Sequence, residues 1–544
     1  MVRFCKLALN FILSGFVFVF LVLVLIFFIN PNQNPDLYDL LLTYADLAVV
    51  YVPAWVVFIT LAFNVVVFFT ERKYPIGFFS PPTPTYFIAF TVLVFSIIAY
   101  FNYQYYYDFF SPQAKARFIR LILMLFALVI AAMVFTISRK RIRRWGQFVF
   151  TMLFLWFVTV SIAQMIAPLP DLPANTADET PWEAILDPPR KVRLVIMEGL
   201  SLNFVLAMSS EQRLHNFNLL MENGARGRFS TFRPNLDAAM TNTLLSGREP
   251  AQFSRHSNLK FQFKSLPTEF DKFPRFIFFR NLETLHVVFF YKDETRRVDD
   301  YDYLRKLYVK AGRKALTWLQ PRPLPFYSRH FLSRNSIFIQ YFSPALQTDD
   351  LKFTLLKKAF FFDENRRRFI PDLKSWKLFY SASILDGMNK VKSGFFQYHQ
   401  PQPFSNVEDA DVERYGWVID RYYDYYDTIL GNLIATTGDD EILVVLSQHE
   451  PEPLPTWRRM IIEHIEKRDV YVYKSLNSMG TVFFYEKKAL RGGTFLDFVS
   501  IYDIFPTLAY YAGFPLSRDL KGQVLKEIFT DDFLIENPVH FKTK

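Results

Sequence analysis

Residues 192–200 read Val-Arg-Leu-Val-Ile-Met-Glu-Gly-Leu, an apolar run that ends on Glu198 and a glycine. Residues 234–250 read Pro-Asn-Leu-Asp-Ala-Ala-Met-Thr-Asn-Thr-Leu-Leu-Ser-Gly-Arg-Glu-Pro, a proline-framed turn that leads into a predicted helix beginning at Asp237. A buried strand ending in an acidic residue, followed by a loop that enters a helix, is how α/β proteins build sites at the carboxyl ends of strands. The sequence therefore predicts a site around Glu198 and Asp237.

Strand-like and helix-like segments alternate from residue 192 onward. The patterns predict strands over 192–197, 375–384 and 441–446, and helices over 211–223, 237–245, 299–317, 408–435 and 501–513. Such alternation favours an α/β domain with a mostly parallel central sheet and helices on both faces.

The composition indicates a membrane part. Hydrophobic residues make up 51% of the 544 residues and aromatic residues 18%, which is high for a soluble protein.

The single cysteine, Cys5, excludes an intrachain disulfide. The net charge of +10 is spread widely and forms no basic stripe, so we expect no nucleic-acid partner. The basic run at 366–368 is expected to be a solvated face rather than an anionic-ligand site.

Five apolar segments precede the α/β domain, at 7–29, 46–70, 85–103, 118–138 and 146–167, each near the ~20 residues that cross a bilayer. The stretches on one side of these segments carry most of the basic residues: Arg3, Lys6, Arg72, Lys73, Arg139, Lys140, Arg141, Arg143 and Arg144. The positive-inside rule then predicts a multi-pass anchor in the lipid bilayer, with the N-terminus in the cytoplasm and the C-terminal domain outside it. No small-residue cleavage site follows the first segment, which favours a retained anchor over a signal peptide.

These patterns divide the chain into three parts. Residues 1–167 are predicted to form a five-helix transmembrane domain, and 168–191 a linker rich in proline and acidic residues. Residues 192–544 are predicted to form the extracytoplasmic domain, with an aromatic and basic insertion at about 252–370.

Four segments carry a resemblance to a known family. They are the strand at 195–200, the proline-framed stretch at 234–250, the run from 387 to 401, and Val-Val-Leu-Ser-Gln-His at 444–449, with a supporting tail at 502–522. The chain resembles the alkaline phosphatase superfamily in its type I phosphodiesterase/nucleotide pyrophosphatase-like, or sulfatase-like, branch. Its five-segment anchor resembles those of the phosphoethanolamine transferases and lipoteichoic acid synthases. The resemblance implies a bacterial cytoplasmic (inner) membrane and a periplasmic domain.

The resemblance also implies a site chemistry that this sequence has largely lost. The family uses two divalent metals and a Ser or Thr nucleophile, and the metals need a crowd of Asp and His ligands. Asp237 stands at the nucleophile position, where its charge opposes a substrate phosphate. The equivalents of the metal ligands include Asp237 itself and five further residues: Glu198, Asn389, Ser393, Gln448 and His449. Neutral amide oxygens and a serine hydroxyl are weak replacements for carboxylates and imidazoles.

Two interpretations of the remaining polar residues stay open. One is a single divalent ion, zinc or manganese, held by Glu198, Asp237 and His449; the other is a hydrogen-bonded remnant with no cofactor. The first functional hypothesis is a membrane-anchored pseudoenzyme with a binding or scaffolding role toward an envelope protein, a lipid headgroup or a glycan. The alternative is a divergent phosphodiesterase or sulfatase-type hydrolase, or a lipid headgroup phosphotransferase.

Overall fold

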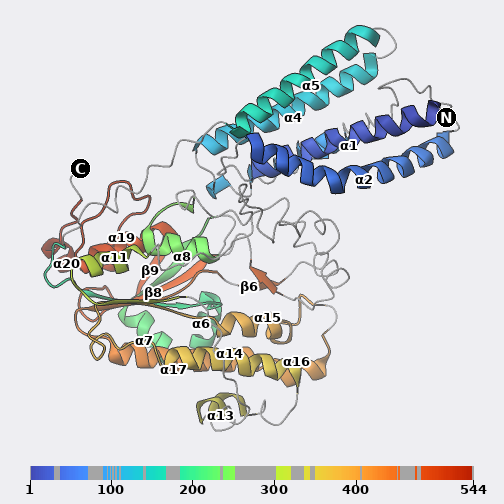
Figure 1. The fold of residues 1–544 in the computed structure, drawn as a ribbon. Coiled ribbons are helices and arrows are strands. Elements are labelled where there is room, and N and C mark those ends of the chain that lie inside the picture. The colour runs from blue at the N-terminus through green and yellow to red at the C-terminus, as the bar shows by residue number, and fades with distance from the viewer. Residues whose placement is uncertain are drawn as a thin grey trace. The chain divides into compact units, whose positions relative to one another are not determined.

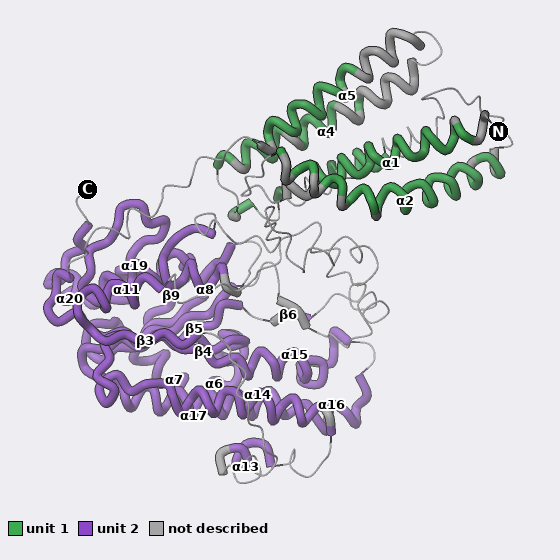
Figure 2. The backbone as a smooth tube through the Cα atoms, in the orientation of Figure 1, with its two compact units in different colours: residues 1–174, 251–294 green, residues 175–250, 295–544 purple. Residues whose placement is uncertain are grey.

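The computed structural model places the chain in two compact units (Figure 1). The first comprises residues 1–174 with 251–294, and the second residues 175–250 with 295–544 (Figure 2). The structure describes residues 2–29, 37–70, short stretches between 90 and 109, and then 112–138, 143–166, 184–232, 237–250, 302–319, 336–343, 350–404, 407–449, 451–453, 472–474 and 479–541. The predicted insertion at about 252–370 therefore lies partly outside the described residues.

The described part of the first unit is helical. Its long helices are α1 (Val2–Ile29), α2 (Leu37–Thr70), α4 (Pro112–Ser138) and α5 (Arg143–Ile166). Judged by length and apolar composition, two helices in the described chain could cross a membrane: Leu7–Val24 within α1, with mean hydropathy 2.7, and Leu47–Val65 within α2, with mean hydropathy 2.0. A shorter apolar stretch, Leu155–Gln164, lies in α5. The predicted segment at 85–103 is only partly within the described residues.

Helices α1 and α2 pack closely against each other. Trp55 of α2 donates a hydrogen bond from Nε1 to Ser14 Oγ at 2.8 Å and stacks on Phe18 with ring centroids 4.5 Å apart. Gly15 allows this approach, because a Cβ there would lie 3.1 Å from Val52 Cγ1. Small residues and buried polar bonds of this kind are typical of helix pairs in membranes.

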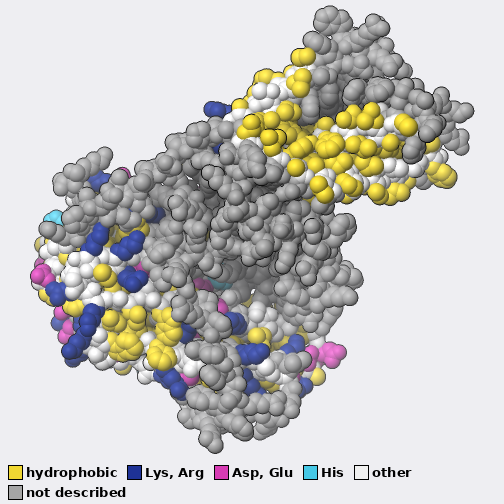
Figure 3. Space-filling view, viewed as in Figure 1, with side chains coloured by type: hydrophobic (Ala, Val, Ile, Leu, Met, Phe, Trp, Pro, Cys, Tyr) yellow, Lys and Arg dark blue, Asp and Glu magenta, His cyan; other side chains and the backbone are white. Residues whose placement is uncertain are grey.

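The surfaces of the two units differ in character. Hydrophobic side chains cover most of the described surface of the N-terminal helices in Figure 3, and Val57, Leu61 and Phe68 on α2 are among the exposed ones. The described surface of the second unit in the same view carries Lys and Arg side chains between smaller apolar areas. An exposed apolar face of this extent is typical of an interaction surface.

The second unit is built on a seven-stranded sheet with the order β3-β4-β1-β5-β8-β2-β9. Its strands are β1 (Lys191–Met197), β2 (Ala225–Ser230), β3 (Ala315–Trp318), β4 (Tyr380–Leu385), β5 (Glu441–Ser447), β8 (Gly480–Tyr485) and β9 (Thr494–Ser500). Strand β8 runs antiparallel to both neighbours, and the other pairings are parallel. The predicted mostly parallel sheet is therefore confirmed. A separate pair joins β6 (Pro451–Pro453) to β7 (Val472–Lys474).

Helices cover both faces of this sheet (Figure 1). One face carries α6 (Leu202–Ser210), α7 (His215–Asn223), α14 (Leu351–Arg367), α15 (Gly387–His399) and α17 (Val418–Thr436). The other carries α8 (Asp237–Ser246), α11 (Tyr303–Lys310) and α19 (Ile501–Ala512), with α20 (Asp531–Glu536) beside them. The remaining short elements are α13 (Ser336–Phe342), α16 (Asp409–Tyr415), η1 (Tyr107–Phe109) and η6 (Lys526–Ile528).

Local sequence signals account for some elements and fail for others. Helix α19 begins with a capping box between Ser500 and Asp503 and ends at Gly513, whose φ of +85° suits a glycine, as predicted. The single helix predicted over 299–317 is wrong, because α11 ends at Lys310, the chain turns at Gly312, and residues 315–318 form β3 at the sheet edge. Likewise the helix predicted over 408–435 is broken into α16 and α17. Pairing with β4, a contact distant in sequence, outweighs local helix preference at β3.

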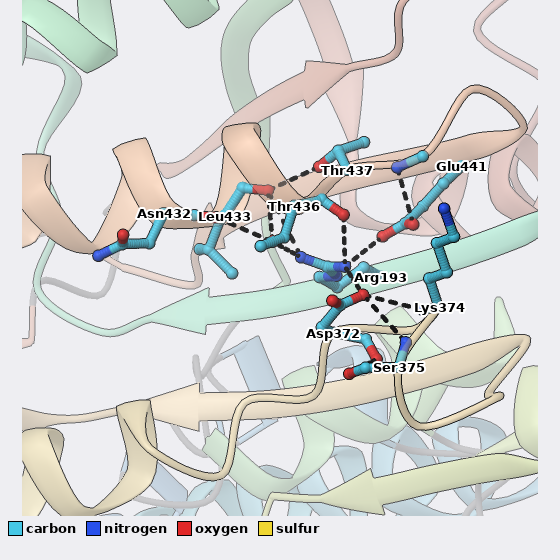
Figure 4. A network of polar contacts seen from close by, with 10 residues as sticks. Arg193, Asp372, Lys374, Ser375, Asn432, Leu433, Thr436, Thr437 and Glu441 are labelled. Atoms are coloured by element: carbon cyan, nitrogen blue, oxygen red, sulfur yellow. Dashed lines mark hydrogen bonds and ion pairs between the residues drawn. The ribbon is translucent and has the colours of Figure 1, made fainter.

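The amino ends of β1 and β5 are held by a buried ion pair. Arg193 on β1 lies 2.7 Å from Glu441 Oε1 on β5, with both side chains about 1% exposed. Figure 4 shows Arg193 between the C-terminal end of α17, Glu441 and Asp372. It also donates to Thr436 Oγ1 at 2.8 Å and to the Leu433 and Thr436 carbonyls. A cation at a helix C-terminus is favoured by the helix dipole.

The basic run at 366–368 differs from its prediction. Arg366 is 3% exposed, donates to the Ile384 carbonyl at 2.6 Å and stacks on Phe362, so the predicted solvated face is wrong for this residue. Arg367 and Arg368 are more exposed and both pair with Glu364. The planar guanidinium of Arg366 can be buried because aromatic faces and a carbonyl receive it.

Candidate functional site

The carboxyl ends of β1 and β5 lie side by side, as their parallel register requires. Glu198 follows β1, and its backbone N–H donates to the Leu385 carbonyl at 2.8 Å. Gly199 has a φ of +83°, and a Cβ there would lie 2.7 Å from the backbone nitrogen of Asn389. The turn after β1 therefore packs directly on the first turn of α15, and only glycine fits that position without strain.

Glu198 and His449 meet at this edge of the sheet. Glu198 Oε2 lies 3.3 Å from His449 Nδ1, and the residues are 4% and 0% exposed. Burial lowers the pKa of His449 to about 4, and the nearby Lys392 ammonium acts in the same direction. The imidazole is therefore neutral at pH 7.

Gln448 joins the end of β5 to helix α8. Its Nε2 donates to Thr241 Oγ1 at 2.6 Å, and Gln448 is fully buried. Asp237 is the first residue of α8, one turn before Thr241. The side chain of Asp237 lies outside the described part of the structure, so its predicted roles as nucleophile equivalent and metal ligand stay predictions.

Helix α15 presents Asn389 and Lys392, rather than Ser393, to the interior. Asn389 is half-buried, and its Nδ2 donates to Asp386 Oδ1 at 3.2 Å. Ser393 is exposed and donates to the Lys390 carbonyl at 2.6 Å, so it does not join the site. Lys392 is 1% exposed, and its Nζ donates to Tyr423 Oη at 3.0 Å.

Side chains of the same domain bind the N-terminal N–H groups of α6 and α15. At α6, Ser201 N donates to Tyr423 Oη and Leu202 N donates to Thr481 Oγ1. At α15, the N–H groups of residues 386 and 387 donate to the Asp363 carboxylate, and Met388 N donates to Tyr426 Oη. Helix N-terminal N–H groups bind anions at many strand-end sites. Here these N–H groups are already hydrogen-bonded to side chains of the same domain.

Asp363 is the internal anion at the start of α15. Its carboxylate also accepts hydrogen bonds from Tyr422 Oη and Tyr426 Oη, each at 2.9 Å. Burial raises the pKa of Asp363 to about 6, although these hydrogen bonds lower it in part. Gly387 makes room for the cluster, because a Cβ there would lie 1.9 Å from Tyr422 Oη.

The described side chains at this edge supply few of the ligands of the two-metal centre that the resemblance implies, and Asp237, at one of the ligand positions, lies outside them. Glu198 is accompanied by a neutral imidazole, an amide bonded to Thr241 and a buried ammonium. Two dications need several carboxylates around them, and an adjacent ammonium repels them. Within the described ranges, no group of three or more His, Cys, Asp and Glu side chains could hold a metal ion.

Three residues of the site were not predicted from the sequence: Thr241, Lys392 and Tyr423. Lys392 did carry a local signal, because it lies among Met388, Val391 and Phe395, which form the buried face of α15. A lysine at helical spacing within an apolar face is a candidate for a buried charge. Thr241 and Tyr423 carried no comparable signal, since their roles depend on contacts distant in sequence.

Comparison with known proteins gives similarity in structure only. No family model and no curated protein matches the sequence. Among solved structures, the phosphonate monoester hydrolase SpPMH from Silicibacter pomeroyi is 14% identical, with 62% of this chain and 76% of that chain covered and a TM-score of 0.33. The structure of Ps i-CgsB in complex with k-i-k-neocarrahexaose is 13% identical, with 64% of this chain and 77% of that chain covered and a TM-score of 0.33.

Murine ectonucleotide pyrophosphatase/phosphodiesterase 5 is 9% identical, with 63% of this chain and 100% of that chain covered and a TM-score of 0.32. These proteins are alkaline phosphatase-superfamily members. At such TM-scores and identities the similarity carries no functional argument, and function is argued from the residues of this chain.

Proposed function

We propose that this chain is a membrane-anchored, non-catalytic alkaline phosphatase-like protein. Its C-terminal domain binds a component of the cell envelope, an envelope protein, a lipid headgroup or a glycan, without turning it over. It needs no cofactor and binds no nucleic acid. The anchor lies in the lipid bilayer of the bacterial cytoplasmic (inner) membrane and passes it five times, with the N-terminus in the cytoplasm and the domain in the periplasm.

One observation carries the non-catalytic part of the proposal. At the strand-end edge, Glu198, Gln448 and His449 are at most 4% exposed; Gln448 donates to Thr241, and Glu198 Oε2 lies 3.3 Å from His449 Nδ1. A phosphoryl-transfer centre needs a nucleophile and cations that reach a substrate phosphate. Side chains buried to this extent do not offer that access.

The closest alternative is a divergent hydrolase or headgroup phosphotransferase with one zinc or manganese ion. The approach of Glu198 Oε2 and His449 Nδ1 to 3.3 Å favours it, because two ligands of one ion lie at a similar separation. In that case Asp237 would complete the ligand set or act as the nucleophile.

Metal content and turnover distinguish these functions. We expect the full-length protein, purified in detergent, to hold less than stoichiometric zinc and manganese and to hydrolyse bis-p-nitrophenyl phosphate no faster than a buffer blank, with or without added metal. Asp237→Ala should behave as the wild type in both assays. Stoichiometric metal together with turnover that Asp237→Ala abolishes would overturn the proposal and support the alternative.

The orientation can be tested with the single natural cysteine. Cys5 is exposed and precedes the apolar part of α1, and Lys488 in the second unit has a side chain 72% exposed. In spheroplasts, a membrane-impermeant maleimide should label Lys488→Cys in a Cys5→Ser background and should reach Cys5 of the wild type only after permeabilisation. Labelling of Cys5 in intact spheroplasts would contradict the proposed orientation.

A further inference from the structure

We propose that the second unit docks on the surface of an anionic phospholipid bilayer through two exposed turns at the amino edge of its sheet. These turns are residues 309–314, between α11 and β3, and residues 372–379, before β4, and we call them the amino-edge surface. The inference rests on the membrane anchor of the proposed function. It does not depend on whether the domain is catalytic.

The two turns lie side by side. The backbone N–H of Phe379 donates to the Lys314 carbonyl at 2.9 Å, and β3 and β4 then continue as parallel neighbours in the sheet. The Arg313 guanidinium lies 5.0 Å from the centre of the Phe379 ring. The side chains of both turns therefore belong to one surface at the amino edge.

The amino-edge surface is basic. It contains five basic residues and one acidic residue: Lys310, Arg313, Lys314, Lys374 and Lys377, with Asp372. The Asp372 carboxylate accepts the backbone N–H groups of residues 374 and 375 and lies 4.0 Å from Arg193. Residues 314, 374 and 377 are exposed and enter no ion pair with the described part of the chain. This excess of positive charge complements an anionic partner.

An exposed tryptophan lies between two of these lysines. Trp376 is 48% exposed, and Val309 on the neighbouring turn is 56% exposed. Figure 4 shows Lys374 and Ser375 of the same turn beside Asp372. A tryptophan ring at the level of the lipid headgroups, with lysine ammonium groups near the phosphates, is typical of protein segments at a membrane interface.

The backbone presents this turn in a fixed conformation. Trp376 N donates to the Asp372 carbonyl at 3.0 Å, and Lys377 N donates to the Lys374 carbonyl at 3.2 Å. Lys377 has a φ of +52°, a conformation that favours glycine over residues with a side chain. Backbone strain of this kind is common where a side chain has a binding role.

The linker favours a bilayer over a soluble acidic partner. Asp187, near the end of the linker, accepts a hydrogen bond from Arg313, and Lys191 at the start of β1 lies 5.8 Å from the centre of the Phe379 ring. Between α5 and residue 184 the chain has 17 residues (167–183), which span at most about 60 Å. A tethered domain meets its own bilayer at a high effective concentration, so a few basic residues are enough to dock it.

Docking through this edge affects the candidate site. Strands β1 and β5 are parallel, so their carboxyl ends, with Glu198 and His449, lie at the opposite edge of the sheet. The candidate site then faces away from the bilayer. Its partner is therefore a component of the periplasm rather than a headgroup of the same bilayer.

Fluorescence quenching in vesicles tests the docking. Full-length Ser375→Cys in a Cys5→Ser background carries the dye NBD on the turn, in vesicles of equal parts phosphatidylcholine and phosphatidylglycerol with a nitroxide-labelled phospholipid. We expect the nitroxide to lower the dye fluorescence by roughly twofold, as for a group at the headgroup level. Phosphatidylcholine alone, or NaCl at about 1 M, should reverse most of this quenching. An unquenched dye in the anionic vesicles would overturn the proposal.

Ser393→Cys in the same background is the matched control. Ser393 is also an exposed serine, but it lies on α15, which begins at the carboxyl edge. We expect its dye to keep its fluorescence in the same vesicles. Quenching at Ser393 as strong as at Ser375 would overturn the proposal, because the contact would then not be specific to the amino edge.

Charge removal tests the two lysines beside Trp376. Lys374→Gln with Lys377→Gln should lower the docking equilibrium constant by about 25-fold, at about fivefold per lysine, and so abolish most of the quenching at Ser375. Lys357→Gln with Lys358→Gln on α14 removes the same charge elsewhere and should leave the quenching unchanged. Equal losses in the two pairs would overturn the proposal.

Extraction with alkaline carbonate separates failure of this inference from failure of the proposed function. Protein released from the vesicles by carbonate would overturn the membrane anchor and this inference with it. Protein that stays with the vesicles but has an unquenched dye at residue 375 would overturn this inference alone. Turnover is not part of either readout.

Discussion

Strands β1 and β5 bury a polar cluster at each of their two ends, and the clusters are built differently. At the amino end, Arg193 and Glu441 meet directly at 2.7 Å, under the C-terminal carbonyls of α17. At the carboxyl end, Glu198 Oε2 lies 3.3 Å from the His449 imidazole, and the Lys392 ammonium of α15 is buried and bonded to Tyr423 Oη. The amino-end cluster joins opposite charges, whereas the carboxyl-end cluster assembles a carboxylate, an imidazole, an amide and an ammonium from separate elements.

This difference distinguishes a cluster that only stabilises the fold from a cluster placed where a ligand could bind. Two charges in direct contact satisfy each other and need nothing from outside the chain. Groups of several chemical kinds, placed where strands end and helices begin, form the arrangement in which α/β folds bind ligands. The carboxyl end keeps that arrangement, and its helix N-termini are bonded to Asp363, Tyr423 and Tyr426.

The largest expected effect tests the amino end. Arg193→Met should lower the free energy of unfolding by about 3–5 kcal/mol, because it leaves Glu441 buried without its countercharge. Denaturant titration of the full-length protein in detergent measures the loss. The double variant Arg193→Met/Glu441→Leu should recover most of it, since no charge then remains buried. A loss under about 1 kcal/mol for Arg193→Met would show that the pair is not structural.

The next effect is a pH dependence at the carboxyl end. Asp363 has a pKa raised to about 6, so between about pH 4 and 6 the native state holds a proton that the unfolded chain has lost. The free energy of unfolding should therefore fall as pH rises through this window. Asp363→Asn should remove its share of that fall, on the order of 2–3 kcal/mol.

Part of the slope should remain in Asp363→Asn. Asp302 is fully buried as well, and burial raises its pKa to about 6. The double variant with Asp302→Asn should flatten the profile further. Urea titrations at several pH values measure how the free energy of unfolding changes with pH. A pH dependence in Asp363→Asn equal to that of the wild type would contradict the raised pKa of Asp363.

A third test compares glycines at the two ends. Gly387→Ala at the carboxyl end should cost about 1–3 kcal/mol, because the new Cβ would lie 1.9 Å from Tyr422 Oη and 2.1 Å from Asp363 Oδ2. Gly438→Ala in the loop before β5 is the control, since its Cβ would meet Glu441 Oε2 at an ordinary 3.4 Å. Equal losses at both positions would show that the Asp363 cluster is not tightly packed.

The smallest effect concerns an exposed pair near the amino end. Lys487 Nζ lies 3.2 Å from Asp439 Oδ1, and both side chains are well exposed. Lys487→Met should leave the free energy of unfolding unchanged within measurement error, at low and at high salt. A clear loss would mean that surface charges, rather than the buried pair, hold this end of the sheet.

The sequence alone determined the three elements that bound the site edge. The apolar run ending at Glu198, the strand ending near Gln448 and the helix entered at Asp237 are all found where the patterns predict them. Parallel strands end on the same edge, so the approach of Glu198 to His449 also follows from the sequence once both strands are placed. Hydrophobic periodicity carries this information because it is a local property of the chain.

The tertiary structure decided which partners those elements meet. Strand β8 enters antiparallel between β5 and β2, and β3 forms an edge strand where a helix was predicted. Arg366, which was expected in solvent, is buried against Phe362 of its own helix and Trp318 of β3, and Lys392 is buried against Phe204 of α6 and Tyr423 of α17. Burial of a charge depends on the carboxylates, rings and carbonyls that distant segments bring to it, and no window of sequence contains them.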